Sequence, residues 1–227
     1  MTLWLQPQIV KLSFIQENKV HSRIDHSYLC ISSDGYDFLS GENSVFMYQG
    51  NTASLQYLSG ERVRFGGCAV FHPENDNLLY ILGGNSMNGV TSSTFVMNLE
   101  NSTFLDLEPM PVISRRHECI GFKLSNGNPV LIIIGGVTAN EFLNSVYLYH
   151  INSNSFTSLA DFPTKIARQS LALKSNFIYV FGGRNGSASE GSDLKAVYRL
   201  DTKEMEPWEK LNDMQTARRS VGVVPYN

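Results

Sequence analysis

Charged residues are scarce in this sequence, and no part of it is strongly basic. Charged side chains make up 17% of the 227 residues and hydrophobic ones 42%, whereas an average soluble domain has roughly 25% charged residues. This composition excludes intrinsic disorder as the main state of the chain. The formal net charge is -3 and no run of basic residues is longer than a pair, so nucleic acid is not an expected partner.

Cysteine and long apolar segments are also scarce. The three cysteines, Cys30, Cys68 and Cys119, form no CxxC pair. We therefore expect neither a disulfide framework nor a zinc site, and free thiols favour a reducing compartment. The longest apolar run, residues 130–134, is far shorter than the roughly 20 residues that cross a bilayer. The first residues lack the basic start of a signal peptide, so we expect a cytoplasmic location and no membrane partner.

Turn-forming residues are abundant, and a repeat runs through them. A Gly-Gly doublet ends an apolar run three times, at residues 83–84, 135–136 and 182–183. Arginines precede the small or apolar runs between the doublets, and their spacings are 51, 53 and 50 residues for Arg64, Arg115, Arg168 and Arg218. A fixed period of this length predicts a repeat architecture built from short strands.

Each repeat contains four predicted strands: one after the arginine, one that ends in the doublet, and two before the next arginine. An eroded copy begins at Arg23, and residues 36–41 stand there in place of the strand that ends in the doublet. A four-stranded unit of this size cannot enclose a core by itself. Radial repetition of such units is typical of β-propeller blades.

The doublets, the aromatic third strands and Trp208 in a predicted fourth strand resemble kelch repeats over roughly residues 23 to 227. The resemblance implies an all-β, kelch-type β-propeller of four-stranded antiparallel blades. The repeats lie at about 23–63, 64–114, 115–167 and 168–217, and residues 1–22 and 218–227 are expected to share a closing blade. Four complete blades and one shared blade make a small or incomplete ring. Three alternatives stay open: a small closed ring, a ring completed by another chain or a homodimer, and a fragment.

No spacing of catalytic or metal-binding residues is present. The five histidines match no metal motif, and neither a nucleophile elbow nor a phosphate loop occurs. We therefore expect no catalytic residue, no metal and no cofactor. Cys68 and Cys119 each lie four residues after a repeat arginine, and we expect both to pack as small hydrophobes at equivalent positions of inner strands.

The repeat arginines are the candidate binding residues. Strand parity places the loops that follow the doublets and the loops that precede the first strands on one face of the disc. Residues 182–185, Gly-Gly-Arg-Asn, match a tetrapeptide with which several kelch-family ubiquitin-ligase adaptors bind partner peptides, and they open a 12-residue loop that ends at Lys195. The alternative is that each arginine only ties its blade to the next one. The expected partner-binding residues are Arg64, Arg116, Arg168, Arg184, Asn185 and Arg219.

These observations predict a non-catalytic protein-interaction module that binds a partner protein or an acidic peptide. The resemblance implies a ubiquitin-ligase substrate adaptor or a cytoskeletal, actin-binding scaffold, although no BTB or F-box region is evident in these residues. The alternative is an enzyme that acts on a sugar, because kelch propellers include a sialic-acid mutarotase. For that alternative, Glu118 near Arg116 is the candidate acid.

Overall fold

The computed structural model describes the backbone of four strands between residues 23 and 58, then residue 64 and residues 66–186 and 191–223. Within these ranges the strands are joined by turns and loops, and a short 3-10 helix, η3 (Ile151–Ser153), follows β13 (Val146–His150). No helix in the described part of the chain is long and apolar enough to cross a membrane.

Four antiparallel sheets of four strands follow one another along the chain, and we name them blades 1 to 4. Blade 1 comprises β1 (Arg23–Ile24), β2 (Ser27–Ser32), β3 (Asn43–Gln49) and β4 (Thr52–Leu58). Blade 2 comprises β5 (Cys68–His72), β6 (Asn75–Leu82), β9 (Thr94–Asn98) and β10 (Thr103–Leu107).

The two later blades repeat this order. Blade 3 comprises β11 (Glu118–Lys123), β12 (Pro129–Ile134), β13 (Val146–His150) and β14 (Ser155–Ser158). Blade 4 comprises β15 (Ser170–Lys174), β16 (Phe177–Phe181), β19 (Val197–Asp201) and β20 (Glu209–Lys210). The predicted all-β fold of four-stranded antiparallel blades is therefore confirmed.

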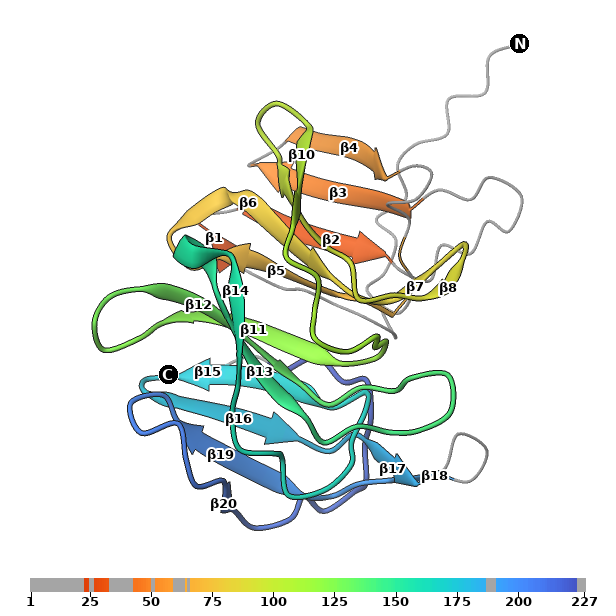
Figure 1. Cartoon of the computed structure of the whole chain (residues 1–227), viewed down its shortest axis with the longest axis vertical. Helices are drawn as coiled ribbons and strands as arrows, with labels where there is room; N and C mark the ends of the chain where they lie inside the picture. The colour runs from red at the N-terminus through yellow and green to blue at the C-terminus, as the bar shows by residue number, and fades with distance from the viewer. Residues whose placement is uncertain are drawn as a thin grey trace.

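Two short hairpins extend the loops between second and third strands. They are β7 (Asn85–Ser86) with β8 (Gly89–Val90), and β17 (Arg184–Gly186) with β18 (Gly191–Asp193). Both lie on the same side of the molecule, opposite the turns that join first and second strands (Figure 1). We call this side, with the loops that precede β11 and β15, the loop face.

The core lies between the blades. Strand β12 is buried on both of its faces, because blade 2 covers one face and blade 4 the other. One apolar cluster joins Tyr80 and Leu82 of blade 2 to Ile133 and Tyr149 of blade 3. A second, larger cluster joins blade 3 to Ile178, Val180 and Leu200 of blade 4. Apolar strands that are covered on both faces explain why residues 130–134 form an uninterrupted apolar run.

A backbone ladder on the loop face connects consecutive blades. The amide of Arg116 donates to the Gly66 carbonyl at 2.5 Å, the amide of Arg168 to the Arg116 carbonyl at 2.9 Å, and the amide of Ser220 to the Arg168 carbonyl at 2.8 Å. All four residues have positive φ values, between 48° and 68°. Gly66, Arg116, Arg168 and Ser220 therefore occupy the same position in successive repeats.

This ladder corrects the alignment of the repeats that the arginine spacing predicted. The residues two positions after the ladder, Cys68, Glu118 and Ser170, pair with the last residue before each glycine doublet. Arg64 lies two positions before the ladder, whereas Arg115 lies one position before it and Arg168 is part of it. The prediction of one repeated arginine position is therefore wrong, and Cys68 and Cys119 are not equivalent.

In blade 1, the strand that pairs with the third strand is not the one that the sequence predicted. Strand β2 pairs with β3 through Tyr28 and Tyr48, and so it occupies the place predicted for residues 36–41, which lie outside the described residues. The predicted closing blade also lies mostly outside them, because residues 1–22 and 224–227 are not described. Residues 218–223 contain no strand, and the amide of Ser220 forms the last hydrogen bond of the ladder.

Candidate functional site

Three charged side chains meet on the loop face beside blade 4. Nη1 of Arg219 donates to Oδ1 of Asp193 at 2.8 Å, and Nη1 of Arg184 lies 3.8 Å from the same oxygen. All three side chains are about one-third exposed. Among the described residues, one carboxylate thus serves two guanidinium groups. Asp193 was not singled out in the sequence, where its distance from both arginines conceals the contact.

The β17–β18 hairpin holds Arg184 and Asn185 in place. Gly182 and Gly183 turn the chain with φ values of 57° and 99°, and Arg184 then exchanges two backbone hydrogen bonds with Ala167, at 2.8 and 3.0 Å. Within the hairpin, Arg184 pairs with Asp193 and Asn185 with Ser192. The turn and the hairpin pairing therefore bring Arg184 and its acid partner together.

Arg64 has a different environment from Arg184 and Arg219. It is buried, with 8% of its surface exposed. Its Nη2 donates to Oγ of Ser93 at 2.6 Å, and its guanidinium lies 5.4 Å from the centre of the Phe95 ring. These contacts stay within blade 2 and its loop. They support the arginine's own blade, whereas the alternative expected each arginine to tie its blade to the next one.

Arg116 and Arg168 contribute their backbones to the ladder on the loop face, and their side chains are half-buried. Both adopt φ of 58°, a left-handed conformation that costs a non-glycine residue free energy unless the surroundings compensate. The structure thus places Arg184 and Arg219 together on one acid, Arg116 and Arg168 on the ladder, and Arg64 inside blade 2.

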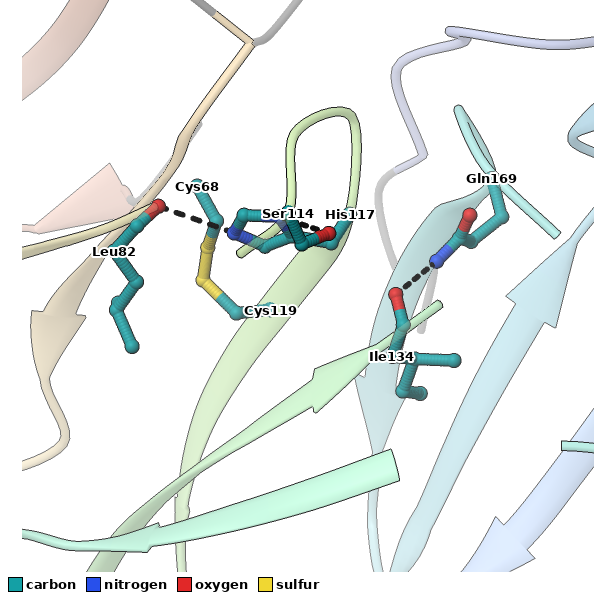
Figure 2. The surroundings of a disulfide bond; sticks show 7 residues. All are labelled: Cys68, Leu82, Ser114, His117, Cys119, Ile134 and Gln169. Atoms are coloured by element: carbon teal, nitrogen blue, oxygen red, sulfur yellow. Dashed lines mark hydrogen bonds between the residues drawn. A yellow bond between two sulfur atoms is a disulfide. The ribbon is translucent and has the colours of Figure 1, made fainter. Parts of the chain in front are cut away.

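Two buried polar side chains clamp neighbouring blades, and the sequence analysis missed this role. Nε2 of His117 donates to the Leu82 carbonyl at 3.1 Å, and Nδ1 lies 3.2 Å from Oγ of Ser114 (Figure 2). Burial lowers the pKa of His117 to about 4, so the ring is neutral at pH 7. Nε2 of Gln169 donates to the Ile134 carbonyl at 2.6 Å. In the sequence, His117 directly follows Arg116 and Gln169 directly follows Arg168. This position after an arginine is the signal that could have located the two clamps.

A disulfide joins Cys68 to Cys119, with a distance of 6.0 Å between their Cα atoms (Figure 2). The expectation of free thiols was therefore wrong for these two residues. The reason is the offset of one residue: Glu118, not Cys119, is the equivalent of Cys68. Because successive side chains of a strand point to opposite faces, Cys119 faces back toward blade 2, where Cys68 lies.

Glu118 shares its face of β11 with Ile120 and Phe122, which belong to the cluster between blades 3 and 4. Part of its surface is exposed, but the surrounding protein desolvates the carboxyl and raises its pKa to about 8. Glu118 therefore holds a proton over much of the neutral range. No hydrogen bond or ion pair of this carboxyl occurs among the described residues.

The chain resembles several known proteins. The Kelch motif family model matches residues 120–163. "Kelch repeat and BTB domain-containing protein 2" of cowpox virus (strain GRI-90 / Grishak) is 21% identical over 236 residues, which cover 95% of this chain. The protein of that name from ectromelia virus (strain Moscow) is 23% identical over 177 residues, 76% of this chain. The "Influenza virus NS1A-binding protein homolog" of Xenopus laevis is 28% identical over 118 residues and covers 50% of this chain and 18% of its own length.

A solved structure, "Structure of YjhT", superimposes with a TM-score of 0.64 at 15% identity and covers 91% of this chain and 70% of its own. This likeness concerns the fold. Together with the sequence matches, it confirms the predicted resemblance to the kelch-repeat family. The chain spans about 40% of the length of the cowpox relative and about 30% of the ectromelia one.

Proposed function

We propose that this chain is a non-catalytic interaction module whose loop face binds a partner protein or an acidic peptide through Arg184, Asn185 and Arg219. The observation that carries the proposal is that two guanidinium groups share the carboxylate of Asp193. An incoming carboxylate would accept charge-assisted hydrogen bonds from the planar guanidinium forks. Arg116 and Arg168 extend the proposed surface, and Arg64 supports it from inside blade 2.

The names of the relatives support a role in protein recognition. Two carry kelch repeats with a BTB domain, and a third is named for binding the influenza virus protein NS1A. For this chain we propose the same class of role in the cytoplasm, as a substrate adaptor of a ubiquitin ligase or as a cytoskeletal scaffold. Affinity capture from the native source, followed by mass spectrometry, distinguishes these roles by returning a ligase subunit or actin.

The site is tested by fluorescence anisotropy with a panel of acidic peptides and their glutamine-substituted counterparts. We expect Arg184→Ala to weaken binding by about 1–3 kcal/mol, because a charge-assisted bond to a desolvated carboxylate is lost. Arg184→Lys should recover only part of the affinity, since lysine lacks the fork. Arg199→Ala is the matched control, because Arg199 pairs with Glu209 on the outer strand of blade 4 at 2.6 Å.

Both Arg184 variants should melt like the wild type. Equal affinity of Arg184→Ala and wild type for the acidic peptides would refute the site. A joint loss of affinity and of melting temperature would show that Arg184 is a structural tie of the hairpin.

A second candidate function, sugar conversion, has one observation in its favour. Glu118 lies on an inner strand and has a pKa raised to about 8, as a general acid requires at neutral pH. If the chain acts on sialic acid, the interconversion of its anomers, followed by NMR, should be faster with the wild type than with Glu118→Gln. Equal rates with and without protein would leave the binding module as the function.

A further inference from the structure

We propose that Cys68 and Cys119 form a reversible thiol–disulfide latch between blades 2 and 3. The two residues lie on the inner strands β5 and β11 of consecutive blades, and β11 contacts β5 directly. Their Cα atoms are 6.0 Å apart, within the range of about 4.4–6.8 Å that disulfides span.

The latch is specific to one junction. At the junction between blades 3 and 4, the positions equivalent to Cys68 and Cys119 hold Glu118 and Leu171, which cannot be cross-linked. That junction has the larger apolar cluster. Blades 2 and 3 therefore combine a smaller apolar contact with a covalent bond whose presence depends on the redox environment.

The pair is also placed to respond to small thiols. Cys68 is 5% exposed, whereas Cys119 is only half-buried, so a thiolate reaches Cys119 more readily. The neighbouring ring of His117 is neutral at pH 7 because burial lowers its pKa to about 4, and it therefore supplies no positive charge to activate either thiol. We expect slow, buffer-dependent exchange rather than a catalytic cysteine.

The chemistry balances with a glutathione couple. Closing the latch converts two protein thiols and one oxidised glutathione into the protein disulfide and two molecules of reduced glutathione. Two electrons pass from the cysteine sulfurs to the glutathione disulfide, and the two thiol protons end on the glutathione thiols. Opening is the reverse reaction, in which a glutathione thiolate attacks one sulfur and forms a mixed disulfide before the second thiolate releases it.

The latch lies beside the backbone ladder, and this gives the test a local signal. Cys68 and Cys119 follow Gly66 and Arg116, whose backbone hydrogen bond joins the same two blades at 2.5 Å. The next bond of the ladder, from the Arg168 amide to the Arg116 carbonyl, joins blades 3 and 4. Opening the latch should loosen the first of these bonds and leave the second unchanged.

The experiment equilibrates the full chain, carrying Cys30→Ser to remove the third thiol, in buffers of defined ratio of reduced to oxidised glutathione. Alkylation and mass spectrometry measure the fraction of paired Cys68 and Cys119. We expect the melting temperature to fall by about 10 °C on full reduction, because a disulfide that closes a loop of this length is lost. Hydrogen exchange should accelerate at Arg116 more than at Arg168.

A variant with Cys68→Ala and Cys119→Ala in the same background is the control, and its melting temperature should not respond to the glutathione ratio. The proposal is overturned if both cysteines alkylate fully after equilibration with oxidised glutathione. It is equally overturned if the melting temperature and the exchange at Arg116 are the same in the paired and reduced forms. Should the alanine variant fail to fold, these two measurements on the paired and reduced protein still decide.

Discussion

The junction between blades 2 and 3 and the junction between blades 3 and 4 use the same backbone contacts. In both, the second glycine of a doublet donates to the loop before the next blade: Gly84 to the Ser114 carbonyl at 2.8 Å, and Gly136 to the Ile166 carbonyl at 2.7 Å. In both, a polar side chain clamps the residue that precedes the doublet, His117 in one and Gln169 in the other.

The side chains around the clamps differ. Ser114 gives the second ring nitrogen of His117 a partner, whereas the equivalent residue in the other junction is Ile166. Oε1 of the buried Gln169 has no hydrogen-bond partner among the residues that the structure describes. The first junction is polar and cross-linked, and the second relies on the larger apolar cluster. The comparison teaches that backbone register defines this fold, while each junction obtains its stability by different chemistry.

The largest effect is expected where the two junctions meet, at Gly136. Its φ is +107°, and a Cβ would lie 2.9 Å from Cβ of His117 and 3.0 Å from the Arg115 carbonyl oxygen, and would also collide with Oγ of Ser114. Gly136→Val should lower the free energy of unfolding by about 4 kcal/mol, since backbone strain and overpacking add. Urea denaturation measures the loss.

Gly89→Val is the matched control for this change. Gly89 has the same φ of +107°, but nothing lies within 4 Å of its Cβ position. It should lose only the strain contribution, about 1–3 kcal/mol. Equal losses at the two glycines would show that close packing at the junctions adds nothing.

The next effect concerns the His117 clamp. His117→Ala leaves the buried Leu82 carbonyl without its donor and should cost about 2–4 kcal/mol. His117→Gln places the residue type of the other clamp, Gln169, in this junction. The glutamine amide can donate to the Leu82 carbonyl, and its oxygen can accept from Ser114, so the substitution should cost about 1 kcal/mol or less. A glutamine variant as unstable as the alanine variant would show that the two clamps are not interchangeable.

The same pair of variants tests the pH dependence of the first junction. Unfolded histidine gains a proton below its ordinary pKa of 6.5, whereas folded His117 stays neutral down to about 4. The unfolded state therefore binds more protons in this window, and stability should fall as the pH falls from 6.5 to 4, by at most about 3 kcal/mol. The glutamine variant should lack this contribution in urea titrations across the window.

Glu118 should give the second junction the opposite and smaller pH dependence. Its pKa is raised from 4.5 to about 8 by desolvation, so the folded state binds more protons between these values. Stability should then decrease as the pH rises from 4.5 to 8, and Glu118→Gln should remove that decrease. Partial exposure of the side chain makes the effect smaller than that of His117. An unchanged slope in the glutamine variant would contradict the assignment.

The smallest effects are expected for the exposed ion pairs. Lys123 of blade 3 bonds Glu74 of blade 2 at 2.8 Å, and both side chains are about half exposed. Lys123→Ala should change stability by less than about 0.5 kcal/mol, because solvent screens such pairs. Lys165→Ala, which breaks an exposed pair with Glu141 at 2.7 Å, should behave alike, and a loss above about 1 kcal/mol in either would contradict the ranking.

The repeat pattern alone was enough to predict the four-stranded blades and the position of Arg184 on the loop face. Glycine doublets after apolar runs mark the second strand of blades 2, 3 and 4, because only glycine tolerates both the positive φ and the close approach of the next blade. Strand parity then placed Arg184 on the loop face, since antiparallel strands alternate their ends.

The tertiary structure decided what the spacings could not show. The arginine spacings varied by a few residues, and a one-residue error in register reverses the face to which a strand's side chain points. For that reason the sequence placed Cys68 and Cys119 at equivalent positions, and the structure joins them. The contact of Asp193 with both Arg184 and Arg219 likewise arises only when a hairpin of blade 4 and the segment after it meet in space. The order of strands is local information, whereas the meeting of side chains between blades depends on how one blade packs against the next.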